Sequence, residues 1–119
     1  RNIDFIILAG FLKLVPSEVT KAYRGRILNI HPSLLPKFGG INMYGNNVHQ
    51  AVLNSKDDQT GITIHEVNEE FDKGKPIAQF SAGLVPGVET IDSIKSKIQR
   101  LEHQNFAPII ESWVKAKSI

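Results

Sequence analysis

The stretch Arg26-Ile27-Leu28-Asn29-Ile30-His31-Pro32 decides how the chain folds. Residues 26–30 are largely apolar, as in a buried strand, and Pro32 prevents the strand from continuing. Asn29 and His31 stand two residues apart, so in a strand their side chains leave the same face. They are therefore expected at the carboxyl end of this strand, which is where open α/β sheets bind their ligands.

A second apolar stretch, Phe5-Ile6-Ile7-Leu8, lies within a predicted strand of residues 3–8. A helix is predicted between the two strands, from about residue 17 to residue 23, and Gly25 closes it. Strand, helix and strand in this order predict a parallel βαβ unit.

The remainder of the chain also alternates between helical and extended patterns. A short helix is predicted at residues 48–53, and strands at residues 60–67 and 76–82 are expected to form a hairpin-like pair. Thr90 can cap a final helix, which Pro108 is expected to interrupt or kink. These patterns predict a single α/β arrangement of layers.

Length and composition exclude several classes of protein. The 119 residues are 41% hydrophobic and 22% charged, which is typical of one globular domain and not of a disordered chain or a coiled coil. The net charge of +2 is spread along the sequence and favours a solvated surface over nucleic-acid binding. The absence of cysteine excludes disulfide and zinc–thiolate sites and favours the cytoplasm, and no apolar run has membrane-spanning length.

Asn29 and His31 are the first candidates for chemistry. An amide donor beside an imidazole can hold a developing oxyanion, and a histidine can also carry a proton near neutral pH. The same pair at a strand end could instead satisfy backbone groups of a turn. The loop that follows, Pro32-Ser33-Leu34-Leu35-Pro36, has no helical or strand period, and rigid loops at strand ends often position a functional group.

The stretch Asn29-Ile30-His31-Pro32-Ser33-Leu34-Leu35-Pro36 resembles the signature of the glycinamide ribonucleotide formyltransferases. Further stretches match this family in order: Leu8-Ala9-Gly10-Phe11, Gly61-Ile62-Thr63-Ile64-His65, Asp72-Lys73-Gly74, Ile77-Ala78-Gln79 and Leu101-Glu102-His103. The family transfers a formyl group from 10-formyltetrahydrofolate to the amine of glycinamide ribonucleotide in purine biosynthesis, without a metal. The resemblance implies a Rossmann-like formyltransferase fold, with an open, mostly parallel twisted sheet flanked by helices.

The resemblance also implies roles for individual residues. Asn29 and His31 would polarise the formyl oxygen, and Asp72 would pair with His31 or order a water that shuttles a proton. The folate would be bound by Leu12, Lys13, Leu14, Val15, Val67, Asn68, Glu69, Glu70 and Phe71. Glu102 and Pro32 would contact the glycinamide substrate, and His65 and His49 would lie behind the reacting groups.

Several of these residues also have an ordinary structural interpretation. The apolar side chains of Leu12, Leu14 and Val15 could simply pack in the core, and Glu102 could be a charge on a helix surface. A histidine within a strand or a helix, such as His65 or His49, is more often structural than functional. The implied partners are small molecules, without nucleic acid or membrane, and a homodimer is left open.

The resemblance covers residues 1–119 as the catalytic and folate-binding part of a single formyltransferase domain. The family's amino-terminal half, with its glycine-rich phosphate loop, has no counterpart here, so the chain is expected to be the carboxyl-terminal half of a longer protein. Residues 40–47 also look longer than the spacer usual in the family. Two alternatives stay open: a formyltetrahydrofolate deformylase and a non-catalytic folate-binding fragment. Pro32 and Leu34 favour the glycinamide enzyme over the deformylases, and the arginine-rich stretch of the methionyl-tRNA formyltransferases is not seen.

Overall fold

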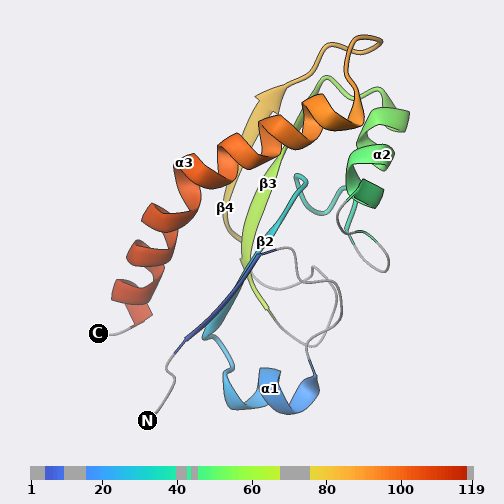
Figure 1. Cartoon of the computed structure of the whole chain (residues 1–119). Helices are drawn as coiled ribbons and strands as arrows, with labels where there is room; N and C mark the ends of the chain where they lie inside the picture. Colours follow the sequence, from blue (N-terminus) through green and yellow to red (C-terminus); the bar gives the residue numbers. More distant parts are fainter. Residues whose placement is uncertain (1–4, 10–15, 40–42, 44–45, 68–75, 118–119) are drawn as a thin grey trace.

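The computed structural model describes residues 5–9, 16–39, 43, 46–67 and 76–117. The strands of this part of the chain are β1 (Ile6–Ala9), β2 (Ile27–His31), β3 (Gln59–Glu66) and β4 (Pro76–Gly83). Its helices are α1 (Ser17–Ala22), α2 (Asn46–Ser55) and α3 (Ile91–Lys117), as Figure 1 shows. In the described residues no helix combines the length and the apolar character that crossing a membrane requires.

The strands form an open sheet in the order β1-β2-β3-β4. β1 pairs parallel with β2, and α1 connects them in the chain, so the predicted βαβ unit is confirmed. β3 pairs antiparallel with β4, which confirms the hairpin-like pair. The α/β class, with an open sheet flanked by helices, is confirmed as well.

The sheet is mixed rather than mostly parallel in its described strands, which corrects one part of the expectation. A parallel pair needs a crossover connection of roughly a dozen residues or more, and residues 67–75 between β3 and β4 are too few for one. Between β2 and β3 the chain includes α2, which lies near one end of the sheet (Figure 1), and β3 pairs antiparallel with β2.

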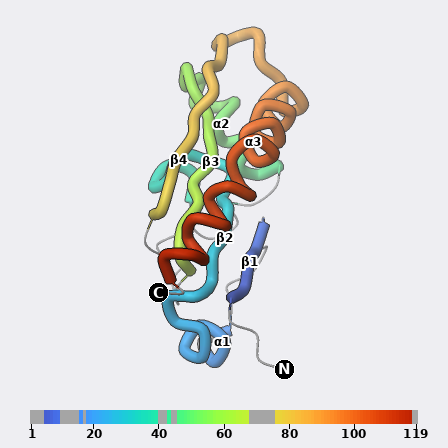
Figure 2. The backbone as a smooth tube through the Cα atoms, turned by 90° about the vertical axis from the view of Figure 1, so that its left-hand side faces the viewer, coloured from blue at the N-terminus to red at the C-terminus, as the bar shows by residue number. Residues whose placement is uncertain are grey.

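One face of the sheet carries the hydrophobic core. The buried members of this core come from β2, β3, α2 and α3 and from the residue after β4, and are Leu28, Ile30, Val48, Val52, Ile62, Ile64, Leu84, Ile94, Ile98 and Trp113. Both views show α3 lying along β3 and β4 (Figures 1 and 2). Burying one aliphatic side chain contributes roughly 1.5–3 kcal/mol, so this layer holds the helices to the sheet. The other face of β2 is left for its alternate side chains, Asn29 and His31.

Helix α3 runs without a break through Pro108, so the expected interruption is absent. A proline inside a helix removes a backbone hydrogen bond and strains the preceding turn. The helix beyond Pro108 is held by Trp113, whose Nε1 donates to the carboxylate of Glu66 at 3.0 Å. The Trp113 ring also meets the ring of Phe5 edge to face, with 5.4 Å between centroids. We infer that this packing offsets the cost of the proline.

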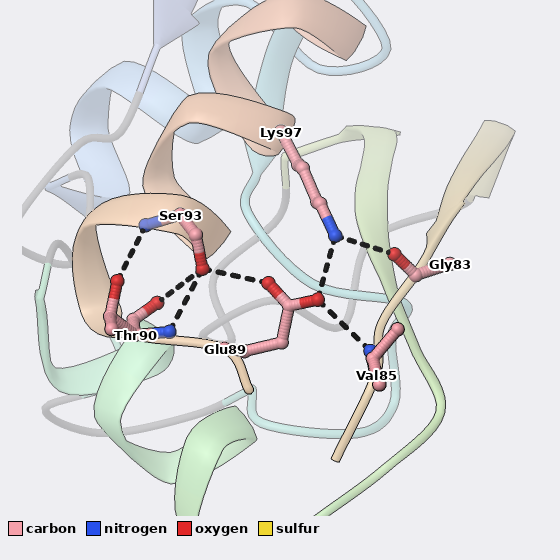
Figure 3. Close-up of polar contacts among 6 residues, drawn as sticks. All are labelled: Gly83, Val85, Glu89, Thr90, Ser93 and Lys97. Atoms are coloured by element: carbon pink, nitrogen blue, oxygen red, sulfur yellow. Dashed lines mark hydrogen bonds and ion pairs between the residues drawn. The ribbon is translucent and has the colours of Figure 1, made fainter. Parts of the chain in front are cut away.

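The turn from β4 into α3 is held by a cluster of polar contacts around Glu89 (Figure 3). One carboxylate oxygen of Glu89 accepts from Lys97 at 2.8 Å and from the amide of Val85 at 2.9 Å, and the other accepts from Ser93 at 2.7 Å. Hydrogen bonds from Lys97, Ser93 and Val85 lower the pKa of Glu89 to about 2. The amide of Ser93 is capped by the hydroxyl of Thr90 at 3.1 Å, which confirms the predicted helix start.

Candidate functional site

Four buried polar side chains lie together on the face of the sheet opposite the apolar core. Asn29 and His31 of β2 stand directly opposite His65 and Thr63 of β3, in neighbouring cross-strand pairs. Each of the four is at most 7% exposed. We call Asn29, His31, Thr63 and His65 the polar patch. Its existence confirms that Asn29 and His31 share one face at the end of β2.

The side-chain amide of Asn29 is oriented by His65. Nδ1 of His65 lies 3.1 Å from the carbonyl oxygen of Glu66, which can only accept, so Nδ1 carries the proton. In the neutral ring Nε2 is then an acceptor, and it lies 3.4 Å from Nδ2 of Asn29, which can only donate. This contact leaves the second N–H of Asn29 for another acceptor. The amide oxygen of Asn29 is buried and has no hydrogen-bond partner in the described part of the chain.

The ring of His31 is tied to the loop that follows β2. Its Nε2 lies 2.8 Å from the carbonyl oxygen of Phe38, so this nitrogen donates. Proton transfer at His31 with this bond intact has to use Nδ1. The ring orientation therefore depends on where the loop holds the Phe38 carbonyl.

The loop itself, residues 32–38, is fastened to the sheet. The amide of Leu35 donates to the hydroxyl of Thr63 at 2.9 Å, and this hydroxyl donates to the carbonyl of Ser33 at 2.7 Å. Gln79 of β4 donates to the carbonyl of Leu35 at 2.9 Å. These contacts hold the loop against β3 and β4. Chemically, the patch offers an oriented amide and an imidazole in a largely water-free place, which suits stabilisation of charge on a carbonyl oxygen.

Comparison with known proteins identifies the family of this chain. A family model described as "Formyl transferase" matches residues 1–110. The chain belongs to the formyl transferase family. The chloroplastic phosphoribosylglycinamide formyltransferase of Arabidopsis thaliana is 46% identical over 92% of the chain and 37% of its own length.

Solved structures of formyl transferases share the fold. The phosphoribosylglycinamide formyltransferase of Bacillus halodurans aligns with a TM-score of 0.82 at 37% identity, over 92% of this chain and 54% of that one. A formyltetrahydrofolate deformylase of Pseudomonas syringae pv. tomato aligns with a TM-score of 0.77 at 25% identity, over 90% of this chain and 34% of that one. The chain thus spans from about a third to about a half of the length of these relatives. Its expected place in their carboxyl-terminal half stays a prediction.

Several residues expected to act in a formyl transferase lie outside the described residues. These are Asp72, Leu12, Lys13, Leu14, Val15, Asn68, Glu69, Glu70 and Phe71. Their roles, including the pairing of Asp72 with His31, stay predictions. Val67, also assigned to folate, is described: its amide donates to the carbonyl of Ile27 at 2.9 Å, just after β3 ends. Pro32 follows His31 directly and is half-buried.

Glu102 and His49 lie on the helices of this formyl transferase chain, not in its sheet. Glu102 is half-buried on α3, and burial raises the pKa of its carboxyl group. His49 is buried on α2, where burial and then the charge of Lys95 lower its pKa, and its Nδ1 has no partner in the described residues. In that part of the chain no hydrogen bond joins either residue to Asn29 or His31, so their substrate and supporting roles stay predictions.

Sequence reasoning missed two residues of the site, Thr63 and Gln79. Thr63 stands two positions before His65 in the same strand, so the strand period places both on one face and could have indicated it. Gln79 had no such signal, because its position beside Thr63 depends on the register of β3 and β4. Among the described residues no three side chains of metal-ligand type gather into a metal site.

Proposed function

We propose that the protein containing this chain transfers a formyl group from 10-formyltetrahydrofolate to the amine of glycinamide ribonucleotide, as a phosphoribosylglycinamide formyltransferase of purine biosynthesis. The observation that carries the proposal is the buried pair of Asn29 and His31, in a chain whose relatives in Arabidopsis and Bacillus bear this name. The substrates are small molecules, and no metal is required by the chemistry. A cytoplasmic location and a homodimer remain predictions, as does the absence of nucleic-acid and membrane partners.

The polar patch fits the charges that this reaction develops. Attack of an amine on the formyl carbon gives a tetrahedral intermediate with a negative oxygen and an excess proton on nitrogen. The N–H of Asn29 not directed to His65 would donate to this oxygen, while the amide oxygen of Asn29, which has no partner among the described residues, would accept an N–H of the amine. His31 would exchange a proton through Nδ1, since its Nε2 donates to Phe38.

The remaining roles complete the proposed site. Asp72 would pair with His31 or order a water that takes up the amine proton. Folate would occupy the segments around Leu12 to Val15 and Val67 to Phe71. Glu102, whose carboxyl group burial already makes a weaker acid, would bind the polar end of the glycinamide substrate.

A deformylase is the second candidate, because a formyltetrahydrofolate deformylase shares the fold at 25% identity. Such an enzyme would deliver the same formyl group to water. The higher identity of 46% to a named phosphoribosylglycinamide formyltransferase, and the resemblance of Pro32 and Leu34 to that family, favour transfer to the amine.

The substitution Asn29→Ala in the complete protein tests the role of the amide. Losing one oxyanion donor lowers turnover by roughly two to three orders of magnitude, so transfer to glycinamide ribonucleotide should fall by about that factor. Folate binding, followed by calorimetry, should persist. The matched control is Asn54→Ala, which changes an exposed amide of α2 whose oxygen accepts a hydrogen bond from Gln50 at 2.9 Å. Turnover of Asn29→Ala close to that of Asn54→Ala would remove Asn29 from the mechanism.

A further inference from the structure

The hydroxyl group of Thr63 makes every hydrogen bond that it can make, with two residues of the loop and with Gln79. It donates to the carbonyl of Ser33 at 2.7 Å and accepts from the amide of Leu35 at 2.9 Å and from Nε2 of Gln79 at 2.9 Å. One hydroxyl has one proton and two lone pairs, so no further bond is available to it. Thr63 is completely buried, and therefore water cannot replace any of these contacts if the hydroxyl is removed.

Gln79 holds the same loop from the next strand. It stands opposite Thr63 in the β3–β4 register, and its Nε2 donates both to the carbonyl of Leu35 and to the hydroxyl of Thr63, each at 2.9 Å. An amide nitrogen has two protons, and these two contacts use both. Thr63 and Gln79 together hold both backbone polar groups of Leu35.

Hydrogen bonds within the loop connect these contacts to the side chain of His31. Within it, the hydroxyl of Ser33 donates to the carbonyl of Lys37 at 2.6 Å, and the amide of Lys37 donates to the carbonyl of Leu34 at 3.1 Å. The next carbonyl along the chain, that of Phe38, accepts the proton of His31 Nε2 at 2.8 Å. The loop therefore leaves the sheet at His31 and returns to the same side chain, and its middle is fastened by Thr63 and Gln79.

We propose that Thr63 and Gln79 are positioning residues for the formyl-transfer site, which act on the ring of His31 through the loop of residues 32–38. We call the hydrogen bonds of Thr63 and Gln79 to this loop the clamp. The inference rests on the proposed function, because it assigns the clamp to that reaction. Neither residue touches the reacting atoms. Their effect is to fix the Phe38 carbonyl, and with it the orientation of the ring that offers Nδ1 to the substrate. Small misplacements of a catalytic group can cost about 100-fold in rate.

The first test compares Thr63→Val and Thr63→Ser in the complete protein. Thr63→Val keeps the size of the side chain but removes the hydroxyl, and should lower kcat by about 10- to 100-fold with little change in KM for the folate. Thr63→Ser keeps the hydroxyl and should restore most of kcat. The matched control is Thr60→Val on the same strand, since the Thr60 hydroxyl is also buried but has no partner among the described residues. Thr60→Val should leave kcat unchanged.

A second variant keeps the proposal testable if Thr63→Val does not fold. Gln79 is exposed, so Gln79→Leu leaves the core intact while removing both donors. It should lower kcat in the same way as Thr63→Val, with a smaller factor because Thr63 still holds Ser33 and Leu35. The clamp would be overturned if Gln79→Leu and every folded Thr63 variant kept the wild-type kcat. It would also be overturned if Thr60→Val lost as much kcat as Thr63→Val, or if Thr63→Ser were as slow as Thr63→Val.

A readout without turnover separates the clamp from the proposed function. This chain has four histidines, and long-range proton–nitrogen NMR of the complete protein reports the protonation of the His31 ring nitrogens. The wild type should show a protonated Nε2 at His31, and Thr63→Val should show its tautomers averaging, while Thr60→Val matches the wild type. An unchanged His31 spectrum in folded Thr63→Val would overturn the clamp. Absence of formyl transfer in the wild type would instead refute the proposed function, and the NMR comparison would still decide whether the clamp exists.

Discussion

Gly61 of β3 is in close contact with Leu34 of the loop of residues 32–38. A Cβ atom added at Gly61 would overlap with the backbone carbonyl oxygen of Phe80 and lie 2.5 Å from Cδ2 of Leu34, where ordinary contacts begin at 3.4 Å. Leu34 is a flexible side chain of the loop and can move, but Phe80 belongs to the β4 backbone that pairs with β3. The substitution Gly61→Ala therefore has to displace both the loop and the strand.

The cost follows from these two displacements. Forcing an extra methyl group into a packed site costs typically 1–3 kcal/mol. Weakening one ladder hydrogen bond of the β3–β4 pair adds about 1 kcal/mol, while the lower backbone entropy of alanine in the unfolded chain returns about 0.5 kcal/mol. We therefore expect Gly61→Ala to lower the free energy of unfolding by about 1.5–3.5 kcal/mol.

Urea unfolding measures this loss, and Gly83→Ala provides the matched control. Gly83 lies on β4, and a Cβ added there meets nothing within 4 Å, so this variant should be neutral or slightly stabilised. The single tryptophan, Trp113, is buried against the sheet and reports the transition by its fluorescence. Equal midpoints for Gly61→Ala and Gly83→Ala would refute the steric reasoning and the close seating of Leu34 on β3.

Two further predictions concern the pH dependence of stability. The pKa of Glu89 is lowered to about 2 in the folded protein, so its carboxylate stabilises above the ordinary value of 4.5, and this contribution is lost as the pH falls towards about 2. Glu89→Gln should therefore be less stable than the wild type at neutral pH, with the difference in unfolding free energy shrinking on acidification; a difference independent of pH would contradict it. The pKa of His49 is lowered below 6.5, so the unfolded chain takes up the proton first and stability is lost as the pH falls through 6.5. His49→Leu should lose less unfolding free energy between about pH 7 and pH 5 than the wild type, and an equal loss would show that His49 does not titrate as described.

The sequence predicted those parts of the molecule that depend on local patterns. Asn29 and His31 share a face because side chains alternate in a strand, and Thr90 caps α3 because its hydroxyl can accept from an amide of the first turn. The path of α3 through Pro108 was not predictable in this way, since the packing of Trp113 on Glu66 depends on contacts distant in the sequence.

Long-range register explains what was missed in the site. The hydrogen bonds of Thr63 reach Ser33 and Leu35 in a loop far earlier in the chain, and that of Gln79 joins β4 to the same loop. No period within one strand predicts which residue will stand opposite another. The antiparallel return of β3 after α2 depends on the same global arrangement, so no local pattern corrected the mostly parallel sheet that the resemblance implied.

Following the fate of the formyl carbon tests the central proposal most directly. The complete protein is incubated with glycinamide ribonucleotide and 10-formyltetrahydrofolate carrying ¹³C in the formyl group, and the products are observed by NMR. We predict that the label appears as a new amide carbonyl on the ribonucleotide, at a rate that the Asn29→Ala substitution suppresses. Label that accumulates only as free formate, with or without the ribonucleotide, would contradict the proposed transfer and point to hydrolysis.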